Sequence, residues 1–384
     1  MNKWRKYLVL ICYFATFQAW GNNLNQDLQH KLDHFRKAYG VPGVVMSISL
    51  PTETATRDFT SGVDRIPNGK PVTTHNLFQI GSISKSFTAA LILKLEARGL
   101  LSLNDTVGDY LPQFKKWHAI TIRQLLNHTS GIYDYTLDAK LDHIKNPRYR
   151  NTTWSLAELA NIAYIHRQQF QPGQDWRYSN TNYILAGMII ETITHRSMAQ
   201  NIQNYFLDPK LYDLTSTHYI SGAYPTSVLS HMAHGYYKNG GEDETYVNLS
   251  WAGSAGAIVS TTHDLVKWAR VLFHGYVLPA HQLHEMETII SRKGGNWLPT
   301  WAHEKGYGLG IGHRYLPGIG SVWSHPGGTT GFSALFMWAE QHDIIVAITA
   351  NSHDVNIQKI NAFGASVLHT VIQHQDEWNR SSLQ

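Results

Sequence analysis

Cysteine is almost absent from this chain, whose single copy, Cys12, lies near the start. The first 21 residues carry three basic residues, then the apolar run Tyr7–Phe17, then small residues, the pattern of a secretory signal peptide. The alternative of a membrane anchor is disfavoured, because the run is short for a span and ends at Gln18. Removal of residues 1–21 would leave no thiol, which excludes disulfides and cysteine catalysis. We therefore expect a secreted protein of the bacterial periplasm with no integral membrane span.

A marked excess of one charge is also lacking. Removing the predicted signal leaves 29 basic residues against 28 acidic ones, a net charge of +1. Such a balance gives no reason to expect binding to nucleic acid or to anionic lipid. With 384 residues, 43% of them hydrophobic, the chain can bury a core without disulfide staples.

The sequence has no His-Glu-x-x-His motif, although it contains 22 histidines. Two groups have a helical spacing that could hold a metal: His231 with His234, and His281 with His284 and Glu285. With no cysteine ligand after the signal, we interpret these histidines as structural or solvated. We expect no metal and no cofactor.

The most informative residues are Ser82 and Lys85, in the run Phe78–Phe87. The apolar residues that follow recur at helical spacing, and on a helix positions three apart share a face. A buried lysine of lowered pKa could then take the serine proton and make the hydroxyl a nucleophile. Alone, the pattern also fits an ordinary serine at a helix start with a solvated lysine one turn later.

Two further segments favour the catalytic interpretation. Tyr178-Ser-Asn180 stands just before an apolar periodic stretch, where a loop enters a helix and a side chain can face a cleft. His325-Pro-Gly-Gly328 follows the short strand-like run Ser321–Ser324. Its glycines would let a substrate backbone lie close to a strand edge.

In this order, the three elements resemble the motifs of serine β-lactamases and penicillin-binding proteins, most closely class C β-lactamases and D-alanyl-D-alanine carboxypeptidases. The runs Leu125–Ile132 and Gly256–Leu265 also look like segments of that family, and the resemblance extends from about Asp33 to Ile372. It implies an α/β domain and an all-helical domain with the active site between them. It also implies that the backbone N–H groups of Ser82 and Gly328 stabilise the oxyanion.

The hydrophobic pattern independently predicts a mixed α/β (α+β) fold. Strands are expected near both ends of the chain and helices between them, which indicates one antiparallel sheet with an inserted helical domain. We predict a discontinuous sheet domain over 22–75 and 300–384, and a mostly helical domain over 76–299. The expected helices cover 25–39, 84–98, 182–194, 265–273 and 356–374; the expected strands cover 44–50, 57–63, 332–338 and 344–350.

The candidate catalytic residues are Ser82 as the nucleophile, with Lys85 and Tyr178 as alternative bases. Tyr178 is also the expected proton donor to the leaving group. The candidate substrate-binding residues are Asn180, His325, Gly327 and Gly328. Asn180 is expected to hold Lys85 or the substrate amide, with a purely structural turn role as the alternative. His128 is interpreted as a residue that stabilises a turn.

His325 departs from the family pattern, because many members carry lysine at this place. An imidazole of ordinary pKa near 6.5 is mostly neutral at pH 7. Its protonated form could bind a substrate carboxylate, or the ring could simply form hydrogen bonds in the cleft wall. The departure weakens the prediction of a dedicated β-lactamase and favours a peptidase or an esterase.

The sequence thus predicts an exported serine hydrolase that acts through an acyl-enzyme on D-amino-acid peptides, like a D-alanyl-D-alanine carboxypeptidase. The alternatives are a class C-like β-lactamase, a small-ester hydrolase and a non-catalytic protein that binds cell-wall peptides. No Gly-x-Ser-x-Gly elbow occurs, which disfavours an α/β-hydrolase esterase. The expected partner is a small peptide, β-lactam or ester.

Overall fold

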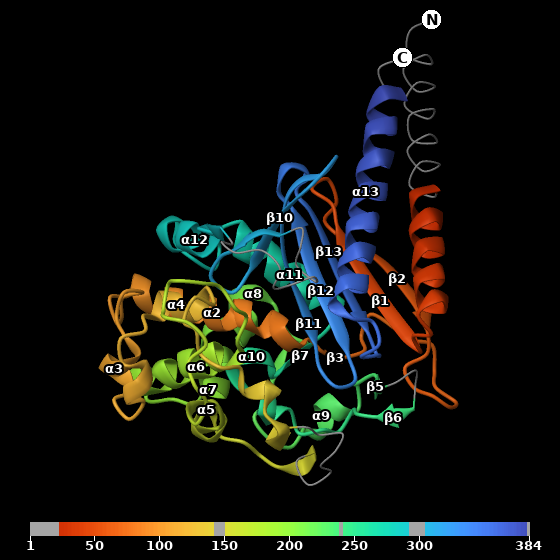
Figure 1. Ribbon diagram of the computed structural model, residues 1–384. Helices are drawn as coiled ribbons and strands as arrows, with labels where there is room; N and C mark the ends of the chain where they lie inside the picture. Colours follow the sequence, from red (N-terminus) through yellow and green to blue (C-terminus); the bar gives the residue numbers. More distant parts are fainter. Residues whose placement is uncertain (1–22, 142–149, 238–240, 292–303, 382–384) are drawn as a thin grey trace, which may run out of the picture.

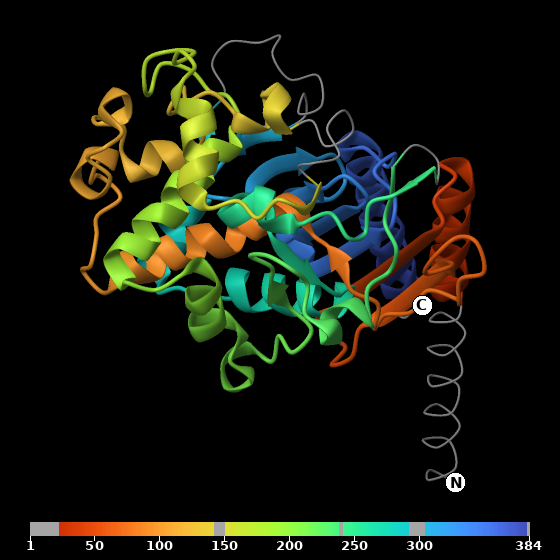
Figure 2. The ribbon, with the colours of Figure 1, turned by 90° about the horizontal axis from the view of Figure 1, so that it is seen from below.

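The computed structural model describes residues 23–141, 150–237, 241–291 and 304–381 (Figure 1). A large sheet flanked by helices lies beside a mostly helical region (Figures 1 and 2). The predicted mixed fold with an antiparallel sheet is confirmed. None of the helices in the described ranges is long and apolar enough to cross a membrane.

The large sheet has eight strands in the order β2-β1-β13-β12-β11-β10-β9-β8. In chain order they are β1 (Gly43–Ser49), β2 (Arg57–Gly62), β8 (Ile290–Ser291), β9 (Glu304–Tyr307), β10 (Gly312–Leu316), β11 (Gly320–Gly328), β12 (Ser333–Ala339) and β13 (Ile344–Ala350). Strand β13 pairs with β1 on one side and β12 on the other, so Ala350 lies opposite both Val44 and Ser333. The two ends of the chain therefore share one sheet.

Helices cover both faces of this sheet, which explains why β12 and β13 are buried along their whole length. On β12, Leu335 and Met337 join the core beneath α13 (Ile357–Ser381) and the N-terminal helix over residues 23–38. The alternate residue Phe336 joins the core that includes α11 (Thr262–Phe273). Successive side chains of a strand point to opposite faces, so the two cores lie on opposite sides of the sheet.

The helical region is built around α2 (Ser84–Ala97), whose residues are buried almost throughout. Phe87 of this helix stacks on Trp268 of α11 with ring centroids 3.7 Å apart. The other helices are α3 (Val107–Tyr110), α4 (Ile122–Leu126), α5 (Leu156–Tyr164), α6 (Asn180–Thr194), α7 (Met198–Ile202), α8 (Pro209–Tyr212), α9 (Thr226–Leu229), α10 (Gly253–Gly256) and α12 (Ala280–Glu287). The short strands β3 (Phe78–Gln79), β7 (Ile258–Ser260) and β4 (His218–Tyr219) form one small sheet, and β5 (Tyr236–Tyr237) pairs with β6 (Glu242–Asp243).

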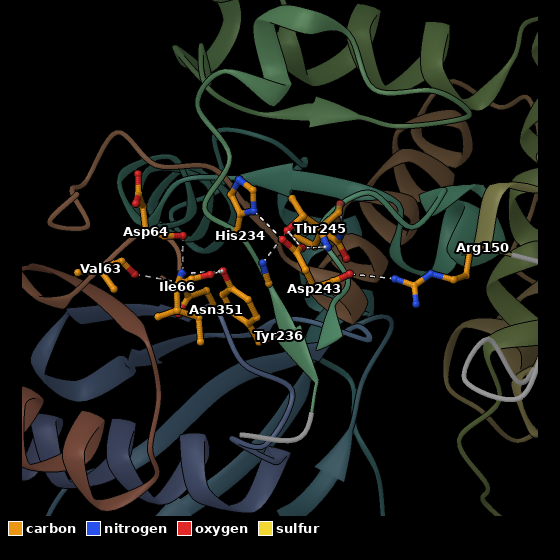
Figure 3. Close-up of polar contacts among 11 residues, drawn as sticks. Val63, Asp64, Ile66, Arg150, His234, Tyr236, Asp243, Thr245 and Asn351 are labelled. Atoms are coloured by element: carbon orange, nitrogen blue, oxygen red, sulfur yellow. Dashed lines mark hydrogen bonds and ion pairs between the residues drawn. The ribbon is translucent and has the colours of Figure 1, made fainter. Parts of the chain in front are cut away.

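The β5–β6 hairpin is held against the large sheet by polar contacts (Figure 3). The Tyr236 hydroxyl accepts from the backbone N–H of Ile66 at 2.7 Å and donates to its carbonyl at 3.1 Å. The Tyr236 N–H donates to the carbonyl of Gly331 in the β11–β12 turn. Within the hairpin, His234 Nδ1 lies 2.7 Å from the Asp243 carboxylate. These contacts fix the hairpin beside the end of β11.

Most expected elements form, with ends shifted by a few residues. The helix that begins at Asn180 starts two residues before its expected position, and α13 continues to Ser381. The strand-like run Ser321–Ser324 is confirmed as part of β11, and this strand continues through His325 to Gly328. The division of the chain into a sheet domain and a helical domain stays a prediction. Two elements within 76–299 are associated with the large sheet: β8 is one of its strands, and α11 packs against it. The predicted signal peptide lies outside the described residues.

Candidate active site

Ser82 and Lys85 meet at the start of α2. Ser82 lies in the 3₁₀ turn Gly81–Ile83, which leads directly into that helix. Lys85 Nζ lies 3.0 Å from Ser82 Oγ. The predicted spacing thus brings amine and hydroxyl within hydrogen-bond distance.

The loop before α6 brings a second polar group to the same hydroxyl. The Tyr178 hydroxyl lies 2.8 Å from Ser82 Oγ. Asn180, the first residue of α6, places its Oδ1 2.7 Å from Lys85 Nζ. Residues almost a hundred positions apart in the chain therefore surround one serine oxygen.

Lys85 is fully buried, and its environment favours the neutral amine. Burial lowers the pKa of Lys85 to about 7, while the Asp134 carboxylate acts in the opposite direction. Besides Ser82, the amine contacts the Asn180 amide oxygen and the Ala255 carbonyl oxygen, at 2.7 and 2.8 Å. These two oxygens can only accept. A neutral amine that gives them its two protons keeps its lone pair for the proton of Ser82.

His128 holds the segment that carries Tyr178. Its ring packs against the Tyr178 ring with centroids 4.3 Å apart. His128 Nδ1 accepts a hydrogen bond from the Ser179 N–H at 3.2 Å and lies 3.1 Å from the Asn182 side-chain nitrogen. Burial, and secondarily the nearby Lys85, lower the pKa of His128 well below its ordinary value. It is thus a neutral residue that positions the tyrosine, in line with its expected structural role.

The end of β11 packs tightly against the turn that carries the serine. A β-carbon on Gly327 would lie 1.9 Å from the carbonyl oxygen of Ile80. Gly81 has φ of +49°, and a β-carbon there would lie 2.6 Å from the carbonyl oxygen of Gly328. Glycine is required at both places because the two backbones approach so closely. The approach places the backbones of Ser82 and Gly328 side by side, as two oxyanion donors would need.

A small cavity opens at this point. Its volume is about 190 Å³, and its walls include Ser82, Asn180, Gly328, Tyr135 and Trp251. The cavity thus presents the serine to aromatic and glycine surfaces, where a carbonyl compound with a compact acyl group can lie.

The comparisons with known proteins agree with this geometry. The model of the Beta-lactamase family matches residues 28–366. The solved D-stereospecific amidohydrolase from Streptomyces sp. is 33% identical to this chain, with a TM-score of 0.73 over 87% of this chain and 96% of that protein. D-amino acid amidase from Ochrobactrum anthropi SV3, solved with L-phenylalanine amide, is 27% identical, with a TM-score of 0.80 over 92% of this chain and 99% of the amidase.

This chain belongs to the Beta-lactamase family. Its membership and its relatives make it a serine hydrolase. Penicillin-binding protein 4* of Bacillus subtilis (strain 168) is 27% identical over 307 residues, which cover 76% of this chain and 64% of that protein. The chain thus spans slightly less than two thirds of this relative's length.

His325, the first residue of the third motif-like segment, has a buried side chain. The Tyr307 hydroxyl donates to Nε2 at 2.9 Å, and Nδ1–H donates to the Pro326 carbonyl at 2.6 Å. Burial, together with the nearby Lys85, lowers the pKa of His325 to about 3, although the hydrogen bond to the Pro326 carbonyl acts in the opposite direction. The ring is therefore neutral near pH 7. This geometry favours the role in the cleft wall over the alternative of a cation that binds a substrate carboxylate.

Sequence reasoning missed Asp134 and Ala255, both of which influence the Lys85 amine. Asp134 lies just beyond the motif-like run that ends at Ile132, but no spacing linked it to Asn180.

The histidines weighed as metal ligands lie elsewhere: His234 contacts Asp243. Within the described ranges no three histidine, aspartate, glutamate or cysteine residues are grouped as a metal site would need.

Proposed function

We propose that this chain hydrolyses amides of D-amino acids through an acyl-enzyme on Ser82. One observation carries the proposal: Ser82 Oγ is contacted at once by a buried lysine amine and a tyrosine hydroxyl. The substrate class is supported by the relatives named for a D-stereospecific amidohydrolase and a D-amino acid amidase.

Acylation would begin with proton transfer from Ser82 to neutral Lys85. Ser82 Oγ then attacks the carbonyl carbon, and the N–H groups of Ser82 and Gly328 stabilise the negative charge on its oxygen. Tyr178 gives its proton to the leaving nitrogen as the C–N bond breaks. The proton held by Lys85 restores the phenol, so the lysine is neutral again.

Deacylation repeats these steps with water as the nucleophile. Water attacks the ester carbonyl, its proton passes to the Lys85–Tyr178 pair, and the C–O bond to Ser82 breaks. Ser82 Oγ regains a proton, and a carboxylic acid leaves. The net reaction consumes one water and releases one amine and one acid.

The charge state of His325 distinguishes two candidate substrate classes, D-amino acid amides and D-alanyl-D-alanine peptides. A D-alanyl-D-alanine carboxypeptidase must bind a substrate whose leaving residue ends in a carboxylate, whereas a D-amino acid amide has no such charge. A neutral imidazole already bonded to Tyr307 and Pro326 offers no positive charge to a carboxylate. This favours the amide over the carboxypeptidase substrate, which stays the second candidate because of the likeness to a penicillin-binding protein.

A substrate panel tests the proposal. The purified protein would be offered D-alanine amide, L-alanine amide, a D-Ala-D-Ala peptide, nitrocefin and a p-nitrophenyl ester, with Ser82→Ala as the control. We expect turnover of the D-amide to exceed that of the L-amide and of nitrocefin, and the Ser82→Ala protein to be inactive. Faster turnover of the D-Ala-D-Ala peptide would support the carboxypeptidase, and efficient nitrocefin hydrolysis would support the β-lactamase. Equal turnover by the Ser82→Ala protein would refute the nucleophile.

We also propose export, from the signal-like pattern of residues 1–21. Cell fractionation of the full chain should find the protein, shortened at its N-terminus, in the periplasmic fraction. A chain of full length in the cytosol would contradict the proposal.

A further inference from the structure

Asp134 carries a buried carboxylate that contacts Asn180, which in turn contacts Lys85. Its Oδ1 accepts hydrogen bonds from the Thr136 N–H at 3.1 Å and the Thr136 hydroxyl at 2.9 Å. The Asn180 side-chain nitrogen donates to both carboxylate oxygens, at 3.3 and 3.1 Å. Asp134 accepts in each of these contacts, the pattern of an ionised carboxylate.

This arrangement determines which way the Asn180 amide faces. Because Nδ2 is bound to the Asp134 carboxylate, Oδ1 must face Lys85, and it lies 2.7 Å from Nζ. Turned by half a rotation, the amide would present its N–H groups to the lysine and its oxygen to a carboxylate, which are both unfavourable. With Oδ1 and the Ala255 carbonyl oxygen each accepting one amine proton, the lone pair of neutral Lys85 is directed at Ser82.

Several polar or titratable groups face the Lys85 amine from the elements packed around it. Tyr178 and Tyr183 present their rings, with centroids 4.9 and 5.4 Å from Nζ. His128 and His325 both carry pKa values lowered by burial and are neutral. Asp134 is the group whose charge favours the lysine ammonium. Burial, the larger influence, favours the neutral amine, and the Asp134 carboxylate shifts the balance back toward the charged lysine.

We propose that Asp134 is a positioning residue for catalysis. It fixes the orientation of the Asn180 amide so that the lone pair of Lys85 faces Ser82, and its charge sets the pH at which that lone pair becomes available. The proposal rests on the proposed acyl-enzyme chemistry at Ser82. Asp134 also begins the 3₁₀ turn Tyr135–Leu137 by accepting from Thr136, a purely structural role. Asparagine serves equally well at such a position, so Asp134→Asn removes the charge while keeping the turn.

The experiment measures the rate of covalent labelling of Ser82 by an uncharged fluorophosphonate between pH 5 and pH 9. Without the negative charge the ammonium of Lys85 is less favoured, so its pKa falls further. The acidic limb of the Asp134→Asn profile should move down by about half a unit to one unit. Its plateau should fall about tenfold to a hundredfold, because the Asn180 amide is no longer locked. The matched control is Asp138→Asn in the same loop, whose carboxylate contacts His166 instead; its profile should match that of the unchanged protein.

A second variant keeps the test decisive if Asp134→Asn fails to fold. Exchanging the two groups, as Asp134→Asn with Asn180→Asp, retains one carboxylate and one amide but puts the carboxylate directly on Lys85. The acidic limb should then move to higher pH by about one unit. Opposite shifts of the two variants support the proposal; if Asp134→Asn does not fold, the upward shift of the exchanged variant alone supports it. If the original protein is labelled but neither limb moves, Asp134 has only its structural role. If the original protein is not labelled at all, the function proposed for Ser82 is itself wrong.

Discussion

The lowered pKa of Lys85 leads to a quantitative prediction about the pH dependence of acylation. Only the neutral amine can accept the Ser82 proton. With a pKa of about 7, the neutral fraction is about one tenth at pH 6, half at pH 7 and nine tenths at pH 8. For an uncharged ester, kcat/KM should therefore rise about tenfold between pH 6 and pH 8 and then level off. A lysine of ordinary pKa, about 10.4, would give a rise of about a hundredfold over the same interval with no plateau.

The assay follows hydrolysis of an uncharged p-nitrophenyl ester, corrected for the hydroxide-driven background at each pH. Lys85→Arg is the matched variant, because a guanidinium stays charged and cannot act as the base. It should show no acidic limb and little activity throughout. A flat profile from pH 6 to pH 9 in the original protein, or a continuous rise with no plateau, would refute the assignment of a neutral Lys85 as the base.

The same titration affects stability. Between pH 7 and pH 10.5 the unfolded chain holds a proton on Lys85 that the folded protein lacks, so the free energy of unfolding rises with pH in this window. Relative to a Lys85→Met variant, the gain between pH 7 and pH 9 should be about 2 kcal/mol. Urea titrations of both proteins at these two pH values measure it. Equal changes in the two proteins would show that the lysine does not titrate in this range.

Three further experiments test other parts of the site. Tyr178→Phe should slow acylation by about a hundredfold to ten-thousandfold in a stopped-flow assay, through loss of a proton donor; an unchanged rate would exclude that role. Gly327→Ala should lower the melting temperature and the activity, because the new methyl group would lie 1.9 Å from the Ile80 carbonyl oxygen. Gly328→Ala is its stability control, since a β-carbon there meets its nearest neighbour only at 4.0 Å. Because the pKa of His325 is about 3, the affinity for an anionic substrate should show no imidazole titration between pH 6 and pH 8; a titration removed by His325→Gln would contradict this.

The sequence predicted local features of this protein well. The three-residue spacing of Ser82 and Lys85 predicted that amine and hydroxyl would meet, because that geometry is fixed within one helical turn. Tyr178 was assigned to the same site from the order of the motifs along the chain, not from its spacing to Ser82. Its assigned role, like those of Asn180, Gly327 and Gly328, stays a prediction for the experiments above.

Burial and long-range contacts were harder to predict. The sequence left open whether His325 binds a substrate carboxylate or forms hydrogen bonds in the cleft wall, because Tyr307 and the rest of its surroundings come from strands whose pairing no local pattern reveals. Asp134 acts through Asn180, 46 positions further along the chain. Neither residue type nor spacing indicates such a pair before the fold places the two side chains together.

The position of β13 between β1 and β12 has a consequence for how the protein is made. During synthesis the segment with Ser82 and Lys85 leaves the ribosome early, whereas the first strands cannot complete their sheet until Ile344–Ala350 has emerged. Contacts between such distant segments form slowly, because a long loop must close before they stabilise anything. The backbone of β11, which confines the serine turn, pairs with β10 and β12 of that late sheet. A chain cut short before β13 would therefore carry every catalytic side chain and still lack a working site.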